Sequence, residues 1–438
     1  MLKFIEMYNF KKCNPQEAVS IIKSRDTVFT SGEPAVLYKA ILDTKDNFED
    51  VRMYALFGLK GKSAEYIHNP EMLGHISFAS SMIGAEESKR WSIENIDHMF
   101  AHFSEMEDLV RRRIKPAVVL ARTCPMDDDG FFYLGDSPGC SRAAVDCNAK
   151  VVVQVDRNMP YVYTDYHRVH ISEIDVLCEA ENPEEYVKPA QPITAKEEKI
   201  AAFIAERIPN GATLQLGVGK VPDAVGVFLD NHKDLGVHTE AFTESMAYLM
   251  KKGAINNSKK TFLPGVSVAA FIDAGPETRK FVHKNRNILL KKLAWINSPM
   301  TVSKIHDMMS INSCLGVDLR GQVCSESIGY SFTGGPGGQL DFIEGARKSP
   351  GGKSFIVMHA AVEKKDGEKI SKITLTLPAG SVVTTPRTDV MYVVTEYGVA
   401  DLKYKSIKEQ AQSLINIADP DFRDQLTFEA RKYGLLQY

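Results

Sequence analysis

The stretch from Leu214 to Val225, LQLGVGKVPDAV, decides the fold of the second half of the chain. Residues 213–216 predict a strand, the glycines after it predict a sharp turn, and Pro222 stands near the start of a helix. A strand that passes through a glycine turn into a helix is the repeating unit of α/β folds. We therefore predict an α/β domain in this half.

A capped helix precedes this strand. Thr194 and Glu197 stand at the two positions of a capping box. Apolar side chains then recur at helical spacing, at Ile200, Phe203, Ile204 and Ile208. Helix, turn, strand and glycine turn together repeat the order expected of an α/β unit.

The first half of the chain opens with the same order of elements. Asn14-Pro15-Gln16-Glu17 predicts a capped helix start, followed by a strand at 27–30 and a turn at 31–34. Apolar runs at 117–121 and 151–155 do not alternate with polar residues, which suits buried parallel strands. The first half is therefore also α/β, and the shared order suggests an internal duplication.

A proline-rich segment separates the two halves. Residues 180–193, AENPEEYVKPAQPI, contain three prolines and little periodic apolarity. A chain of 438 residues is also too long for one ordinary core. We place a first domain at 1–185, a linker at 186–194 and a second domain at 195–438.

Composition excludes several classes of protein. Hydrophobic residues make up 44% and charged residues 25%, as in a folded globular protein. A net charge of −3 argues against nucleic acid as a partner, although a substrate with phosphates would still need a local cluster of Lys or Arg. No apolar run is long enough to span a membrane, so no membrane partner is expected.

Cysteine and histidine usage bears on compartment and metals. The seven cysteines are scattered and never form Cys-x-x-Cys, which favours a reducing, cytoplasmic location. The N-terminus shows no signal-peptide pattern. The eleven histidines show no metal-binding spacing, so no metal site is expected.

A second glycine-rich segment is Gly334 to Ala346, GGPGGQLDFIEGA. Its first five positions include four glycines, which suit backbone that bends sharply or approaches a ligand closely. Such amides bind phosphates or developing oxyanions, and a solvent-exposed turn without a ligand is the alternative. The first loop, Gly217-x-Gly219-x-x-Pro222, matches neither a dinucleotide fingerprint nor a P-loop, so neither NAD nor ATP is indicated.

Glu240 is a candidate nucleophile. It follows the short apolar segment 235–237, where a strand would end, and ligands of open α/β sheets gather beyond the carboxyl ends of strands. The alternative is that Glu240 is a solvated glutamate at the start of the next helix. Taken by themselves, the residues favour this alternative. Glu244 and Glu396 compete on the same grounds, and the neighbouring His238 reads as a structural histidine.

Together these segments resemble the acetyl-CoA hydrolase/transferase family of class I CoA-transferases, and within it the 4-hydroxybutyrate and butyrate:acetate CoA-transferases. The likeness covers nearly the whole chain. Besides the loops at 214–225 and 334–346 and the motif GVHTE at 236–240, it is carried by DTVFTSGEP (26–34), CPMDDDGFFYLG (124–135), VHISEID (169–175), VVTEYGVADL (393–402) and INIADPDFR (415–423).

The resemblance implies a fold and an activity. The fold would be two similar open α/β domains of the CoA-transferase type, with the active site in the cleft between them. The activity would be transfer of CoA between a short-chain acyl-CoA and acetate by a ping-pong mechanism, with CoA as substrate and no tightly bound cofactor. Acyl-CoA hydrolysis and non-catalytic CoA binding are the alternatives. A homodimer or homotetramer is also implied.

The resemblance further assigns residues. It places the nucleophile at the Glu of a His-Thr-Glu motif, here Glu240. It places CoA against Gln215, Leu216, Gly217, Val218, Gly219, Leu315, Gly337, Gly338 and Gln339. Leu315 lies in the apolar run 311–319, which predicts a strand, and core packing is its alternative role. Lys220 either meets a CoA phosphate or is solvated. The acid pocket would include residues 31–34, and residues 69–93 are either a further wall or ordinary core and surface.

Overall fold

The computed structural model describes residues 2–90, 96–180 and 192–437. The chain forms two compact units, the first from residues 1–188 with 269–295 and the second from residues 189–268 with 296–438. The linker predicted at 186–194 falls mainly outside the described ranges. Because residues 269–295 belong to the first unit, the chain crosses between the units more than once, which a single linker does not anticipate.

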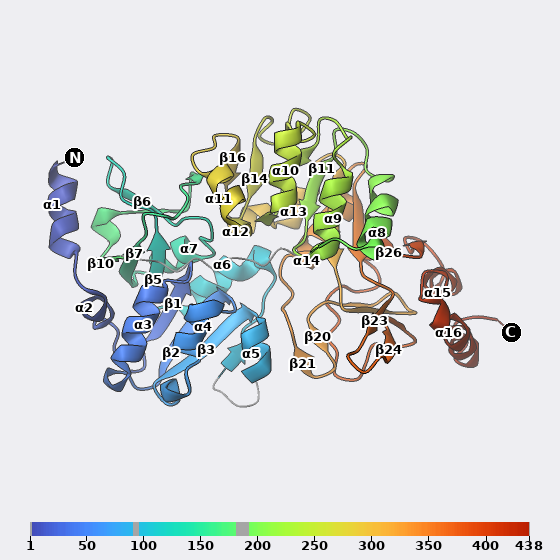
Figure 1. The fold of residues 1–438 in the computed structure, drawn as a ribbon, viewed down its shortest axis with the longest axis horizontal. Coiled ribbons are helices and arrows are strands. Elements are labelled where there is room, and N and C mark those ends of the chain that lie inside the picture. Colours follow the sequence, from blue (N-terminus) through green and yellow to red (C-terminus); the bar gives the residue numbers. More distant parts are fainter. Residues whose placement is uncertain (1, 91–95, 181–191, 438) are drawn as a thin grey trace. The chain divides into compact units, whose positions relative to one another are not determined.

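The first unit contains a seven-stranded parallel sheet in the order β10-β7-β5-β1-β2-β3-β4 (Figure 1). The runs predicted as buried strands at 27–30, 117–121 and 151–155 form three adjacent strands of this sheet, β1, β5 and β7. The strands are β1 (Thr27–Ser31), β2 (Val51–Phe57), β3 (Ile76–Met82), β4 (Ile96–His98), β5 (Val118–Thr123), β7 (Lys150–Val155) and β10 (Val176–Glu179).

Short helices pack on this sheet. The helix α2 (Pro15–Val19) begins at Asn14, whose side chain forms the predicted capping box with Glu17. The helix α3 (Ala35–Asp43) buries Leu37, Tyr38 and Ile41 in the main core of the unit. The other α-helices that begin in this unit are α1 (Leu2–Lys11), α4 (Gly61–Ile67), α5 (Ala85–Arg90), α6 (Met106–Leu109), α7 (Ser141–Val145), α11 (Pro276–Val282) and α12 (Leu293–Ile296). Of the segment 69–93, residues 76–82 form β3 and 85–90 form α5, whereas 91–93 lie outside the described ranges.

The second unit contains a six-stranded sheet in the order β12-β11-β17-β22-β26-β27. Its neighbouring strands are parallel except for β26 and β27, which are antiparallel. The strands are β11 (Thr213–Leu216), β12 (Gly236–Val237), β17 (Met308–Ser313), β22 (Lys353–Val357), β26 (Tyr392–Thr395) and β27 (Gly398–Asp401). The predicted strand at 213–216 is confirmed as β11, and all four of its residues are buried.

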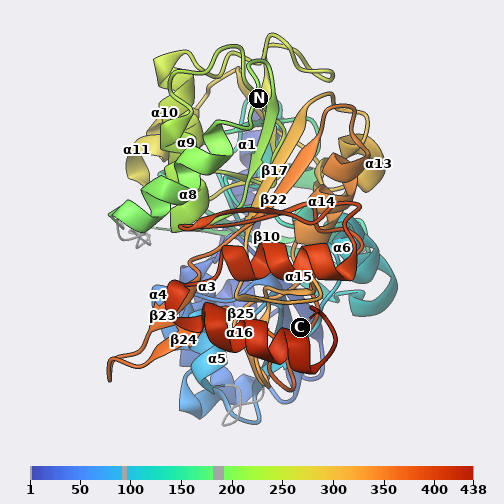
Figure 2. The same cartoon turned by 90° about the vertical axis from the view of Figure 1, so that its right-hand side faces the viewer.

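The helices of the second unit occur in the predicted order, before the strand β11 and after its glycine turn. The helix α8 (Ala195–Ala205) begins at the capping box of Thr194 and Glu197, and the helix α9 (Lys220–Phe228) follows the glycine turn. The others are α10 (Glu244–Lys252), α13 (Pro299–Val302), α14 (Gln339–Lys348), α15 (Ile407–Asn416) and α16 (Pro420–Lys432). Figure 2 shows α15 and α16 side by side at the C-terminal end of the chain.

The single strand expected at 311–319 is wrong. The strand β17 ends at Ser313, and β18 (Gly316–Asp318) belongs to a separate small sheet with β19 (Val323–Cys324) and β25 (Ile373–Thr374). The apolar character of the run is correct, but its second half pairs with β19, a few residues further on, and with β25, which lies far along the chain. Local sequence does not show such a change of partner.

In both main sheets, the strand that comes first in the chain is followed by strands on one side of it and later by strands on its other side, so the strand order reverses there. In the second unit β12 lies on one side of β11 and β17 on the other, and in the first unit β2 and β5 flank β1 in the same way. In open α/β sheets, ligands bind beyond the carboxyl ends of the strands at such a switch point. The glycine turn after β11 lies at the switch point of the second sheet. The turn at 31–34, after β1, lies at the switch point of the first sheet.

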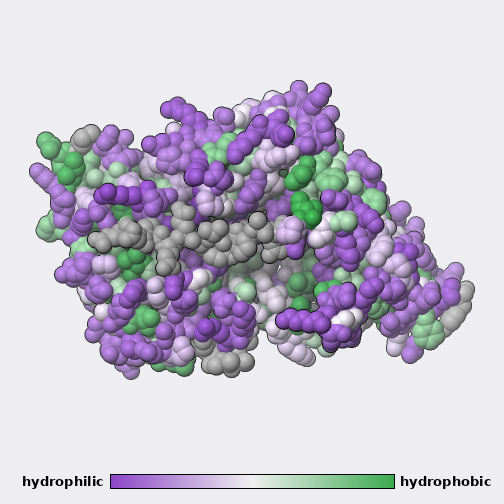
Figure 3. All heavy atoms as spheres, in the orientation of Figure 1, coloured by the Kyte–Doolittle hydropathy of each residue, from purple (hydrophilic) through white to green (hydrophobic). Residues whose placement is uncertain are grey.

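Hydrophilic residues cover most of the face shown in Figure 3. Across the described ranges, no helix combines the length and the apolar character that a membrane crossing requires.

Candidate active site

Glu240 lies just beyond the carboxyl end of a strand, as predicted. The strand β12 ends at Val237, and the backbone N–H of His238 still donates to the carbonyl of Leu214 at 3.1 Å. Glu240 comes two residues later. The helix α10 begins at Glu244 with Thr243 as its N-cap, so Glu240 does not open this helix. The alternative role considered for Glu240, at the start of the helix, belongs to Thr243 and Glu244.

Two amide groups hold the Glu240 carboxyl. The Asn297 Nδ2 donates to Glu240 Oε2 at 2.8 Å, and the backbone N–H of Gly338 also bonds to this carboxyl. A Cβ on Gly338 would lie 2.1 Å from Glu240 Oε2 and 1.9 Å from Asn297 Nδ2, so a side chain here would displace these two groups from their present positions. The structure therefore brings Gly338, one of the predicted loop residues, into direct contact with Glu240.

His238 fixes the chain segment that carries Asn297. Its ring is fully buried, and Nε2 donates a hydrogen bond to the carbonyl of Ile296 at 2.9 Å. Burial lowers the pKa of His238 to about 3, which keeps the ring neutral. The structural role expected for His238 matches this geometry.

The surroundings of Glu240 raise its pKa to about 7. Burial is the main cause, and the negative charge of Asp341 adds to it, whereas the hydrogen bonds from Asn297 and Gly338 act in the opposite direction. The carboxyl is therefore poised between its neutral and ionised forms near neutral pH. Titratable groups at functional sites often show such shifts.

Gln215, assigned to the CoA contacts by the resemblance, uses its side chain inside the sheet. Its Nε2 donates to Asn312 Oδ1 at 3.0 Å, and its Oε1 accepts from Ser310 Oγ at 2.7 Å. These bonds tie the end of β11 to the end of β17. Leu216 is buried beside it, so a ligand at this turn would meet backbone rather than these two side chains.

The rest of the first loop lies at the switch point. The N–H of Gly217 donates to the carbonyl of Ile311 at 2.8 Å, which holds the turn against β17. Gly219 has φ 135° and is the N-cap of α9, a conformation that favours glycine. Val218 is 48% exposed and Lys220 is also exposed, so both can meet a ligand or solvent.

The second loop ends at the N-terminus of α14. Gly337 has φ 54°, Gly338 is the N-cap, and Gln339 is the first helical residue. Gln339 Nε2 donates to Thr385 Oγ1 at 3.0 Å, which anchors the start of the helix. The N-terminus of a helix favours negative charge, and Glu240 lies at this one.

Leu315 lies in the break between β17 and β18. Its side chain is partly buried, and its N–H donates to the carbonyl of Cys324 at 2.8 Å. This break and the first loop leave the sheet at the same edge as Glu240. The Glu240 carboxyl itself contacts Asn297 and Gly338.

Asn297 is the residue of this site that the sequence does not reveal. It occurs in the segment Trp295-Ile296-Asn297-Ser298-Pro299, which has no recognisable motif. The third candidate glutamate, Glu396, is buried and accepts from the backbone N–H of Ala360 at 2.8 Å. It therefore stabilises backbone.

Two family models match the chain. The acetyl-CoA hydrolase/transferase N-terminal domain matches residues 3–205, and the C-terminal domain of the same family matches residues 276–430. The chain belongs to the acetyl-CoA hydrolase/transferase family. Asn297 and Gly338 fall inside the C-terminal match, whereas Glu240 and the first loop fall between the two matches.

The relatives of this CoA-transferase also have names that belong to CoA-transferases. It is 37% identical to the 4-hydroxybutyrate coenzyme A transferase of Clostridium kluyveri, over 98% of this chain and 100% of the relative. It is 34% identical to the butyryl-CoA:acetate CoA-transferase of Anaerostipes caccae, over 98% of each chain. The crystal structure of RipA from Yersinia pestis superimposes with a TM-score of 0.93 at 30% identity, over 99% of this chain and 100% of RipA. The predicted family, fold class and enzyme class are confirmed.

Across the described ranges, no group of three or more His, Cys, Asp or Glu side chains is placed to hold a metal ion.

Proposed function

We propose that this enzyme moves CoA between a short-chain acyl-CoA, either butyryl-CoA or 4-hydroxybutyryl-CoA, and acetate. The names of the two relatives support this choice of substrates. The observation that carries the proposal is the Glu240 carboxyl, held by Asn297 and Gly338 where the second sheet ends.

In the first step, an ionised oxygen of Glu240 attacks the thioester carbonyl carbon of the acyl-CoA. The carbon–sulfur bond breaks, the CoA thiolate leaves, and Glu240 becomes part of an acyl-glutamyl anhydride. The thiolate then attacks the glutamyl carbonyl of this anhydride. The first carboxylic acid leaves as its carboxylate, and a glutamyl-CoA thioester remains on Glu240.

The second half of the reaction repeats these steps in reverse. Acetate attacks the glutamyl-CoA carbonyl, the thiolate leaves, and an acetyl-glutamyl anhydride forms. The thiolate attacks the acetyl carbonyl, which gives acetyl-CoA and restores the Glu240 carboxylate. Charges and atoms balance without any cofactor.

Asn297 and Gly338 have two roles in this scheme. In the resting enzyme their N–H groups orient the nucleophile. When the glutamyl carbonyl is attacked, negative charge develops on an oxygen of Glu240 itself, the carboxyl that these donors already contact. A well-aimed donor of this kind is typically worth about 3 kcal/mol of barrier.

Hydrolysis of the acyl-CoA is the second candidate. The same glutamyl intermediates would react with water if water reached them, so the residues that hold Glu240 serve either outcome. Transfer predicts CoA exchange that requires an acceptor acid, whereas hydrolysis predicts release of free CoA without one.

The proposal is tested by mass spectrometry of the protein after incubation with butyryl-CoA and reduction with borohydride. We expect a modification at Glu240 that is absent from the Glu240→Gln variant and present in Glu244→Gln, a matched exposed glutamate nearby. A modification at another residue would refute Glu240 as the nucleophile. Release of free CoA without acetate would favour hydrolysis over transfer.

A further inference from the structure

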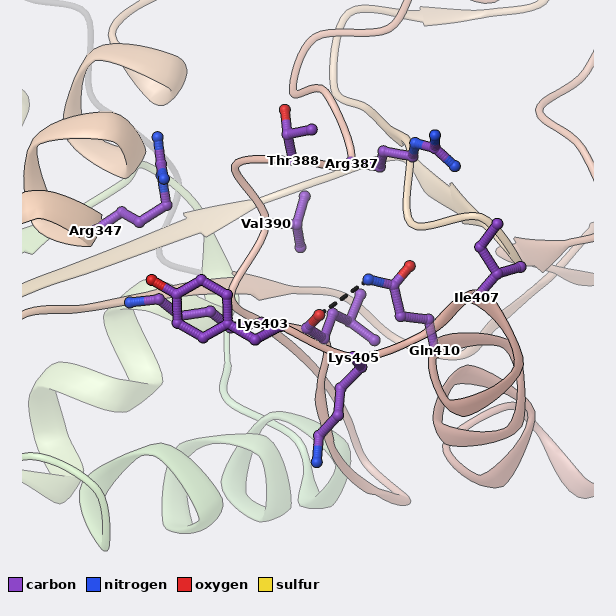
Figure 4. Close-up of a pocket in the computed structure, with 10 residues that line it drawn as sticks. Arg347, Arg387, Thr388, Val390, Lys403, Lys405, Ile407 and Gln410 are labelled. Carbon is purple, nitrogen blue, oxygen red and sulfur yellow. Dashed lines mark hydrogen bonds between the residues drawn. The ribbon is translucent and has the colours of Figure 1, made fainter.

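A basic pocket lies in the second unit, with a volume of about 280 Å³. Of the ten residues that line it, four are cationic and none is acidic: the cations are Arg347, Arg387, Lys403 and Lys405. Figure 4 shows Val390 in the middle of the view with these cationic side chains around it. A local cluster of Lys and Arg is what a phosphate-bearing ligand requires, although the net charge of the whole chain is −3.

The basic pocket is at the opposite edge of the sheet from Glu240. Arg347 is in the last turn of α14, whereas Gly338, which contacts Glu240, caps the first turn of the same helix. A helix of 10 residues is about 15 Å long. Val390 precedes β26 and Lys403 follows β27, which also places the pocket where the parallel strands begin. The pocket is therefore separate from the carboxyl that we propose as nucleophile.

Positive charge in the basic pocket is only partly compensated. Arg347 pairs with Asp389 at 2.9 Å, but its buried Nε has no hydrogen-bond acceptor within the described part of the chain. In the same described ranges, no carboxylate forms an ion pair with Arg387, Lys403 or Lys405. A buried donor without an acceptor destabilises the folded protein. An anionic ligand would supply both acceptor oxygens and negative charge.

The turn at one side of the basic pocket is held in an unusual conformation. Tyr404 has φ 60°, which non-glycine residues rarely adopt, and Lys403 and Lys405 flank it. Gln410 Nε2 donates to the carbonyl of Leu402 at 2.9 Å, the dashed line in Figure 4, and so ties α15 to this turn. The helix α15 begins at Ile407, so the positive end of its dipole adds to the charge of the lysines.

We propose that the basic pocket binds a small anion that carries a phosphate or pyrophosphate group. Guanidinium groups present paired donors that match phosphate oxygens, and lysines add point charges. The volume lies just below the usual range for ligand pockets, about 300 to 1,000 Å³, which favours a small ligand. The phosphate group would belong either to a free phosphorylated metabolite or to the nucleotide part of CoA.

Calorimetric titration with inorganic pyrophosphate at low ionic strength tests whether the basic pocket binds such an anion. The variant is Arg387→Gln/Lys403→Gln, which removes two cations without breaking the pair of Arg347 and Asp389. Lys365→Gln, an exposed lysine in the turn between β23 (Ala361–Glu363) and β24 (Lys369–Ser371), is the matched control. We expect saturable binding to the wild type and the control, and binding at least about tenfold weaker to the double variant.

Three results would overturn the proposal: no saturable binding to the wild type, equal affinity in the double variant, or binding of succinate in place of pyrophosphate. A parallel titration with CoA separates the two sources of the phosphate. If the double variant weakens CoA to the same extent, the phosphate is that of CoA. If CoA affinity is unchanged, the ligand is a separate phosphorylated metabolite. Because binding is measured directly, failure of CoA transfer would not affect either result.

Discussion

Gly338 and Glu240 touch so closely that a single methyl group cannot be placed between them. A Cβ built on Gly338 would lie 2.1 Å from Glu240 Oε2. The residues are separated by almost a hundred positions in the sequence, and their contact joins the second glycine-rich loop to the candidate nucleophile. The glycine is therefore needed for the approach of a side chain, and its φ of −100° is one that any residue adopts.

The substitution Gly338→Ala is expected to lower kcat for CoA transfer by about a hundredfold, because the new methyl group displaces the Glu240 carboxyl from Asn297. Gly334→Ala is the control in the same loop, since a Cβ there would meet only ordinary contacts at 3.5 Å or more. Steady-state kinetics with butyryl-CoA and acetate, beside thermal unfolding, would measure both effects. Wild-type kcat in Gly338→Ala would show that the contact has no role in catalysis.

The substitution Asn297→Ala removes a donor to Glu240 and is expected to reduce kcat by about 10²-fold to 10³-fold. The hydrogen bond from Asn297 lowers the pKa of Glu240, so its loss should also move the acidic limb of the rate profile to higher pH. A purely structural role for Asn297 would reduce stability without moving this limb. The pH dependence of kcat/KM in the two proteins distinguishes the two cases.

The wild-type enzyme itself should show a marked pH dependence. Glu240 attacks only when ionised, and burial raises its pKa to about 7. We therefore expect kcat/KM to fall about tenfold per pH unit well below pH 7 and to level off above it. Measurement with a saturating acceptor acid isolates the first half-reaction. A profile that is flat between pH 5 and 8 would contradict the raised pKa or the assigned nucleophile.

Features of this site that depend on neighbouring residues can be predicted from the sequence, whereas features that depend on contacts between distant segments cannot. The strand at 213–216, the capping boxes and the position of Glu240 at a strand end were all predictable, because capping and hydrophobic pattern are local. The contact of Asn297 with Glu240 was not, because it depends on how two distant segments pack. For the same reason the break at Leu315 and the inward hydrogen bonds of Gln215 were missed.

The raised pKa of Glu240 also makes the stability of the folded protein depend on pH. Burial makes the ionised form unfavourable in the folded protein, whereas the unfolded chain ionises near its ordinary value of 4.5. Between pH 4.5 and about 7 the folded state holds a proton that the unfolded state releases, so the free energy of unfolding falls as pH rises through this window.

Replacing Glu240 with Gln removes this titration while keeping the size of the side chain. We expect Glu240→Gln to abolish transfer and yet to be more stable than the wild type above pH 7, by about 1–3 kcal/mol, with the difference vanishing below pH 4.5. Urea unfolding at pH 4.5 and pH 8 would measure it, with Glu244→Gln as the exposed control. A variant that is equally stable, or less stable, at pH 8 would mean that the folded enzyme accommodates the charged carboxylate without cost.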